Sequence, residues 1–245
     1  IARSSPMNSI GVNLKSFFYH LEKYENGEIA YPLFGDDGLS TYKSFVLRNA
    51  GNDWEQGSKY RDAAIQQVLR GKVDLETQDF QPVVMYLNGE YWGLINMRER
   101  FGEDYFAGYY DYADDIDLLK YCNDSSYNFR AQKGDTKRLG ELMTYLANNS
   151  MSDDANYQYV KNHYIDVDNM INYYIAQLFS QNTDWPTNNM RMWRPRTENG
   201  KFRFPWYDAD FGYGLWGGDA STNPREKFDK SGYNKKTSIA MLNYM

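Results

Sequence analysis

The most informative part of the sequence is a pair of short stretches, Thr183-Asp-Trp-Pro-Thr-Asn-Asn189 and Trp206-Tyr-Asp-Ala-Asp-Phe-Gly212. A helix is predicted before the first stretch, from about Asp168, because apolar residues recur there at helical spacing. These residues are Met170, Ile171, Tyr174, Ile175, Leu178 and Phe179. Two short strands, 190–194 and 201–205, are predicted between the stretches, around a turn-rich segment that ends at Gly200. The predicted order is therefore a helix, a loop with one carboxylate, a hairpin and a loop with two carboxylates.

This order is that of the C-terminal lobe of a protein kinase. Phosphoryl transfer needs a carboxylate that takes the acceptor proton, and carboxylate and amide oxygens that hold magnesium on the phosphates. Asn189 follows Asp184 at the Asp-to-Asn spacing of the kinase catalytic loop. Each residue alone has a simpler explanation, because Asp184 could form a turn and Asp208 and Asp210 could solvate a strand end. Order and spacing together favour Asp184 as catalytic carboxylate, with Asn189, Asp208 and Asp210 as metal ligands.

The first half of the chain is richer in predicted strands. Tyr42 to Arg48 has strand composition, and 60–70 is predicted as a helix, with Ala64, Ile65, Val68 and Leu69 on one face, that stops at Gly71. Asn88-Gly89 between two apolar runs, 83–87 and 91–97, is a strong hairpin signal. A further helix, capped by Asp135, opens the second half. We therefore expect a single α+β domain with a strand-rich lobe of about 1–125 and a helical lobe of about 126–245.

Two basic residues on the first predicted strand are candidates for contacting phosphates. A kinase places such a cation on an N-terminal strand. Lys43 and Arg48 are an odd number of positions apart, so strand alternation puts them on opposite faces. At most one of them therefore points into a cleft.

Composition excludes several other kinds of protein. The 27 basic and 33 acidic residues give a net charge of −6, which argues against a nucleic-acid partner. No apolar run is long enough for a membrane span. One cysteine, Cys122, and two histidines, His20 and His163, leave little material for a zinc site.

Several motifs together resemble the spore-coat protein H (CotH) family. They are Tyr42-Lys-Ser-Phe-Val-Leu-Arg-Asn-Ala-Gly-Asn-Asp53, Arg61-Asp62, Tyr86-Leu-Asn-Gly-Glu-Tyr-Trp-Gly-Leu94, Glu99, and Tyr207-Asp-Ala-Asp210 with Gly214. The resemblance implies a two-lobed atypical protein kinase fold, ATP with Mg²⁺ or Mn²⁺ as cofactors, protein serines as acceptors, and a secreted or cell-surface location. It also implies that Asp184 is the catalytic-loop carboxylate and Asn189 a metal ligand.

The resemblance leaves some assignments open. Either Asp208 or Asp210 is the direct metal ligand, and the family's Phe-Gly pair corresponds to Phe211-Gly212 or is represented by Tyr213-Gly214. Glu99 has an implied role in contacting nucleotide or pairing with a cation, and the alternative for it is a surface salt bridge.

Other functions stay open at this stage. Asn8 stands where the family usually has lysine, which would suit a catalytically inactive domain. Such a domain would bind surface or glycan partners through its many aromatic residues. A third alternative is a nucleotide-sugar glycosyltransferase, since Asp-x-Asp also holds a metal against a diphosphate. The first residues lack a signal segment, and the chain is expected to be trimmed at both ends.

Overall fold

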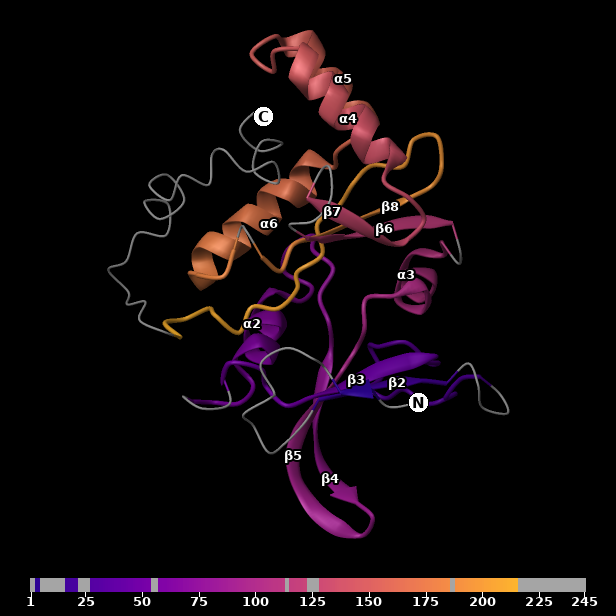
Figure 1. Cartoon of the computed structure of the whole chain (residues 1–245), viewed down its shortest axis with the longest axis vertical. Coiled ribbons are helices and arrows are strands. Elements are labelled where there is room, and N and C mark those ends of the chain that lie inside the picture. Colours follow the sequence, from indigo (N-terminus) through magenta and orange to yellow (C-terminus); the bar gives the residue numbers. More distant parts are fainter. Residues whose placement is uncertain are drawn as a thin grey trace.

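The computed structural model describes residues 3–4, 16–21, 27–53, 57–112, 115–122, 128–185 and 188–215. Asn8 and the last thirty or so residues lie outside this part of the chain. The described residues form two antiparallel sheets with helices between and above them, so the fold is α+β as predicted (Figure 1).

The first sheet contains only residues that precede residue 99. Its strands are β1 (Arg3–Ser4), β2 (Phe17–His20), β3 (Ser44–Arg48), β4 (Phe80–Leu87) and β5 (Glu90–Arg98), in the order β1-β2-β3-β5-β4. β4 and β5 form the predicted hairpin, and both turn residues, Asn88 and Gly89, have positive φ. This conformation suits the right-handed twist of the strands. The hairpin extends well beyond the rest of the sheet (Figure 1).

The second sheet has the order β7-β6-β8. Its strands are β6 (Ile116–Tyr121), β7 (Phe129–Lys133) and β8 (Arg191–Pro195). β6 pairs with both of the later strands. The predicted strand 190–194 is confirmed as β8, but 201–205 forms only isolated bridges at Phe202 and Arg203.

The helices separate and cover the sheets. They are α2 (Arg61–Leu69), α3 (Glu103–Tyr110), α4 (Lys137–Asn148), α5 (Asp154–His163) and α6 (Val167–Ser180). α2 lies between the first sheet and α6 (Figure 1). Gly71 has a φ of +66° just after α2 ends, which confirms the predicted stop. None of the described helices is long and apolar enough to cross a membrane.

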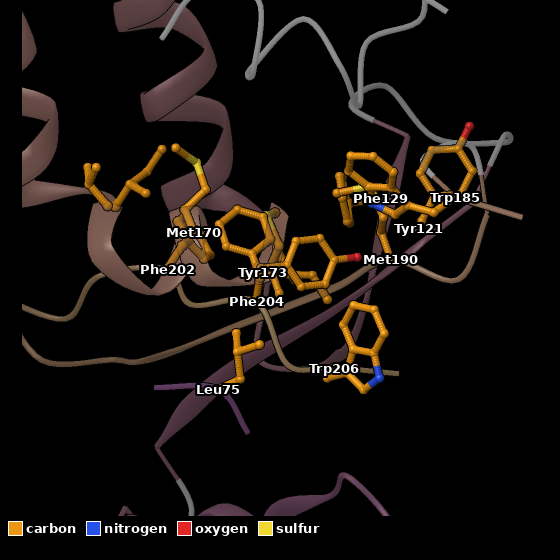
Figure 2. Close-up of a cluster of buried hydrophobic side chains, with 14 of the residues drawn as sticks. Leu75, Tyr121, Phe129, Met170, Tyr173, Trp185, Met190, Phe202, Phe204 and Trp206 are labelled. Atoms are coloured by element: carbon orange, nitrogen blue, oxygen red, sulfur yellow. The ribbon is translucent and has the colours of Figure 1, made fainter. Parts of the chain in front are cut away.

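The largest core lies between α6, the second sheet and the segment that follows β8. Tyr173 of α6 packs against Phe204 and Trp206, with ring centroids 5.5 and 6.0 Å apart (Figure 2). α2 contributes Ile65 and Leu69 to this same core. A second cluster joins α3 to β6 and β8 through Phe106 and Trp193 and their neighbours. These two cores fix the segment that ends in the two aspartates.

The predicted buried face of α6 is partly wrong. Ile171, Ile175 and Phe179 are 48, 56 and 59% exposed, whereas Asn169 and Gln177 are buried. Asn169 donates to the carbonyl of Asp74 and accepts from the Phe204 amide, at 3.0 and 2.7 Å. Buried polar groups with hydrogen bonds have thus replaced part of the apolar face.

The same change occurs on α2. Of the four residues predicted to share its buried face, Ala64 and Val68 are exposed, while Asp62 and Gln66 are buried instead. Asp62 and Gln66 are one helical turn apart and hydrogen-bonded to each other at 3.2 Å. The buried polar face of α2 points toward the site described next.

Candidate functional site

Arg48, the last residue of β3, joins three carboxylates from distant parts of the chain. Its Nη2 contacts Asp208 and lies 3.3 Å from Oδ2 of Asp210. Its Nη1 lies 3.5 Å from Oδ2 of Asp62, at the start of α2. The Arg48 and Asp208 side chains keep 18 and 21% of their surface exposed, so the cluster is reached from solvent on one side.

Asp62 is the most constrained carboxylate of the cluster. It accepts hydrogen bonds from Nη1 of Arg98, from the Ala209 amide and from Gln66, at 2.5, 2.8 and 3.2 Å. Burial alone would raise the pKa of Asp62, but the guanidinium groups of Arg98 and Arg48 hold it well below its usual range. Asp62 is therefore ionised, and its bond to Ala209 fixes the backbone between the two aspartates.

Asp210 has a different environment. Its Oδ2 accepts from the Asn52 amide at 3.0 Å, and a Cβ on Gly51 would lie 2.6 Å from the same oxygen. Gly51 has a φ of +58°, so both the conformation and the space favour glycine there. Burial and the neighbouring Asp208 carboxylate raise the pKa of Asp210 to about 7, although Arg48 acts against the shift. The loop after β3 thus closes over a buried carboxylate that has Arg48 beside it.

Asp184 and Asn189 are held together in the loop after α6. Oδ2 of Asp184 accepts from the side-chain amides of Asn189 and Asn188, at 2.6 and 2.9 Å. The Asp184 amide donates to Oδ1 of Asn182 at 3.2 Å, and Asn182 in turn donates to Gln177 of α6 at 3.0 Å. The buried polar face of α6 therefore positions the predicted catalytic carboxylate.

The loop after α6 also lies beside the Asp-x-Asp segment. The amide of Tyr213 donates to the carbonyl of Ser180 at 2.7 Å, and the amide of Thr183 to the carbonyl of Phe211 at 3.4 Å. Arg61, next to Asp62, donates to the carbonyls of Gly212 and Tyr213, at 3.2 and 2.7 Å. β3, α2 and the two loops thus meet in one region.

The two basic candidates have different positions. Arg48 contacts the aspartates, whereas Lys43 precedes β3 and has an exposed side chain. Arg48 is therefore the cation that faces the carboxylate cluster.

Glu99 is not at the surface, so a surface salt bridge is wrong for this residue. It is 2% exposed, and its carboxylate accepts from the Asp79 amide and the Tyr109 hydroxyl, at 2.9 and 2.8 Å. Burial raises the pKa of Glu99 to about 7. Its observed contacts join the end of β5 to α3.

This shift predicts that stability depends on pH through Glu99. Between pH 4.5 and 7 the folded chain keeps a proton on Glu99 that the unfolded chain has released. The free energy of unfolding should therefore fall as pH rises through this window, by on the order of 3 kcal/mol at about 1.4 kcal/mol per pKa unit. Urea denaturation of Glu99→Gln should show a flatter profile, the remaining slope coming from Asp210 and Asp79, because burial raises the pKa of both.

Glutamine suits this position because it offers one acceptor to the Asp79 amide and one donor to the Tyr109 hydroxyl. Glu90→Gln, at the exposed tip of the hairpin, serves as the control and should keep the wild-type profile. An unchanged slope in Glu99→Gln would contradict the assignment.

A divalent metal fits the donor set of this region. Mg²⁺ in phosphoryl-transfer sites takes one or two carboxylates and completes its shell with phosphate oxygens and water. Asp208 and Asp210 offer two carboxylates, and the positively charged guanidinium of Arg48 forms salt bridges with both of them. Within the described ranges, no group of three or more His, Cys, Asp or Glu is arranged around a metal position.

Comparison with protein families decides the relationship. The family model described as CotH kinase protein matches residues 12–243, nearly the whole chain. The chain belongs to the CotH kinase family. A search of curated proteins gave no match.

Some of the resemblance motifs of this CotH kinase family member converge in the structure, whereas the motif from Tyr86 to Leu94 lies in the projecting β4–β5 hairpin (Figure 1). Arg48, Asp62, Asp208 and Asp210 form one cluster, and Asp53 holds Arg61 through a salt bridge of 3.0 Å. Arg98 was not singled out from the sequence, although it directly follows the predicted hairpin. The signal that could have found it is a basic residue at the end of a strand otherwise rich in apolar residues.

Proposed function

We propose that this chain is an atypical two-lobed protein kinase that transfers the γ-phosphoryl group of ATP to serine hydroxyls of a protein. The observation that carries the proposal is the contact of Arg48, on a strand of the first sheet, with both aspartates of the loop after the second sheet. A cation on an N-terminal strand and carboxylates on an opposing loop are the parts that hold a nucleotide triphosphate and its metal in kinases. Membership of the CotH kinase family supports the same activity.

The residues then have distinct roles. Asp184 accepts the proton of the serine hydroxyl while the serine oxygen forms a bond to the γ-phosphorus. At the same time the bond between the γ-phosphorus and the oxygen of the β-phosphate breaks, which releases ADP. Asp210, with Asp208 and Asn189, would hold the divalent ion, which when bound neutralises charge on the phosphates. Arg48 would contact the phosphates. Asn189 keeps the Asp184 carboxylate in place through its 2.6 Å hydrogen bond.

The strand arrangement favours a kinase over a glycosyltransferase. All the named strand pairs are antiparallel. A nucleotide-sugar donor domain of the Rossmann type would instead place the diphosphate at the carboxyl ends of parallel strands.

Calorimetric titration with ATP tests the metal assignment. Wild type should bind ATP only when Mg²⁺ or Mn²⁺ is present. Asp210→Ala should weaken this binding at least about tenfold, and more than Asp208→Ala, because Asp210 is fixed by the Asn52 amide. Asp168→Ala removes an exposed carboxylate of α6 and is the matched control. Metal-independent binding, or none with either metal, would contradict the proposal.

A further inference from the structure

Arg48 occupies the carboxylate oxygens that a metal ion needs. Its Nη2 contacts Oδ1 of Asp208 and lies 3.3 Å from Oδ2 of Asp210. The Asp210 oxygen also accepts from the Asn52 amide, so part of its accepting capacity is already used. A metal ion and a guanidinium bound to the same oxygens would be two cations a few ångströms apart, and they would repel each other.

A second acceptor for Arg48 is already in reach. Oδ2 of Asp62 lies 3.5 Å from Nη1 of Arg48, on the other side of the same guanidinium. Arg98 and the Ala209 amide hold Asp62 in position and keep it ionised. Arg48 can therefore withdraw from the two aspartates without losing every ionised partner.

Phosphate is the natural additional partner for such an arginine. A guanidinium binds phosphate oxygens through paired N–H donors, and one of its two terminal nitrogens, Nη2, now faces Asp208 and Asp210. A nucleotide would thus compete with the aspartates for Arg48. When nucleotide binds, its phosphates would therefore free the carboxylate oxygens of Asp208 and Asp210. The same phosphates would complete the coordination shell of the metal ion.

We propose that Arg48 acts as a built-in counterion of Asp208 and Asp210, and that the metal gains full access to them only when the guanidinium pairs with phosphate and Asp62 instead. This inference rests on the proposed function for the identity of the phosphate ligand. It implies that metal affinity depends on nucleotide: the metal alone binds weakly, and the metal together with nucleotide binds tightly. It also means that removing a cation from the site improves binding of another cation.

Mn²⁺ binding to the full chain without nucleotide tests the counterion role. Free Mn²⁺ is measured by electron paramagnetic resonance for wild type, Arg48→Gln and Lys72→Gln. The control, Lys72, is an exposed cation just after α2 that has no part in the site. Arg48→Gln should bind Mn²⁺ alone at least about tenfold more tightly than wild type, because the like charge has gone. Lys72→Gln should agree with wild type within about twofold.

The nucleotide dependence is measured with a non-hydrolysable ATP analogue. In wild type the analogue should raise Mn²⁺ affinity at least about tenfold, and in Arg48→Gln this gain should be much smaller. The wild-type comparison remains informative even if the variant does not fold. Circular dichroism establishes whether it does.

The results separate this inference from the proposed function. Equal or weaker Mn²⁺ binding by a folded Arg48→Gln chain would overturn the counterion role, and so would wild-type affinity that does not depend on the analogue. Absence of phosphoryl transfer to protein, with the Mn²⁺ results as expected, would instead count against kinase activity alone.

Discussion

Asp184→Asn should reduce phosphoryl transfer by about 10²- to 10⁴-fold while ATP binding stays close to that of wild type. The amide cannot take the serine proton, but it keeps the size and planar shape of the carboxylate. The Asn182 side chain still accepts from the backbone amide of residue 184, so the loop should retain its position. Initial rates with radiolabelled ATP, together with calorimetric ATP affinity, measure the two effects separately.

The control for this prediction is Asp168→Asn, an exposed carboxylate on the helix that leads into the same loop. It should transfer phosphate at the wild-type rate. Full activity of Asp184→Asn would show that another group accepts the proton. Equal losses of ATP affinity and rate would show that the loop, rather than the chemistry, had been damaged.

The largest effect on stability is expected from Asp62→Ala. Arg98 is 3% exposed, and its Nη1 donates to the Asp62 carboxylate. The other side-chain nitrogens of Arg98, Nε and Nη2, have no hydrogen-bond partner among the described residues. Removing the carboxylate leaves a buried guanidinium uncompensated, which typically costs about 3–5 kcal/mol. Urea denaturation should show this loss as a lower midpoint.

The reverse change should cost less. After Arg98→Met, Asp62 still has the Ala209 amide, Gln66 and Arg48. The double variant Asp62→Leu with Arg98→Met should be more stable than Asp62→Ala, because it leaves neither charge buried alone.

An exposed pair provides the control for this cycle. Glu103 pairs with Lys133 at 2.8 Å, and both side chains are more than a third exposed. Glu103→Ala should therefore change stability by less than about 1 kcal/mol. If Asp62→Ala is as mild as this control, Arg98 must gain another partner when Asp62 is lost.

Local patterns in the sequence predicted much of the framework. Positive φ at Asn88 and Gly89, and at Gly71, is set by residues that tolerate it, so the hairpin and the end of α2 follow from neighbours in sequence. The N-cap of α4 is Thr136 rather than the predicted Asp135, whose carboxylate still accepts from the nearby Lys137 amide at 2.8 Å. The α+β class and the positions of β3, α2, α6 and β8 follow from such signals.

The orientation of the helices did not follow from periodicity. An apolar pattern assumes that the buried face is apolar, but Asp62 and Gln66 of α2 and Asn169 and Gln177 of α6 are buried for their hydrogen bonds. Asp62 also bonds the Ala209 amide 147 positions away, and Asn169 bonds the Asp74 carbonyl 95 positions away, so no local pattern contains these partners. The bonds of Asp62 and Gln177 support the candidate site, whereas Asn169 holds the segment after β8.

The candidate site was predicted in its parts but not in its connections. Spacing predicts Asp184 and Asn189 as a pair, and the hydrogen bond between them is observed. The contact of Arg48 with Asp208 and Asp210 joins residues about 160 positions apart, and only the folded chain reveals it. Their catalytic and metal-binding roles stay predictions.

The sharing of one core by α2 and the second half of the chain determines how the protein unfolds. Ile65 and Leu69 of α2 belong to the large core, whereas the cluster around Met85 and Ile95, among the described residues of the first sheet, is small. So small a cluster gives the first sheet little cohesion of its own. The first sheet therefore depends on the packing of α2 in the large core for its stability. The two sheets should unfold in one cooperative transition. A ligand that binds only the second half of the chain should therefore also raise the melting temperature of the first sheet.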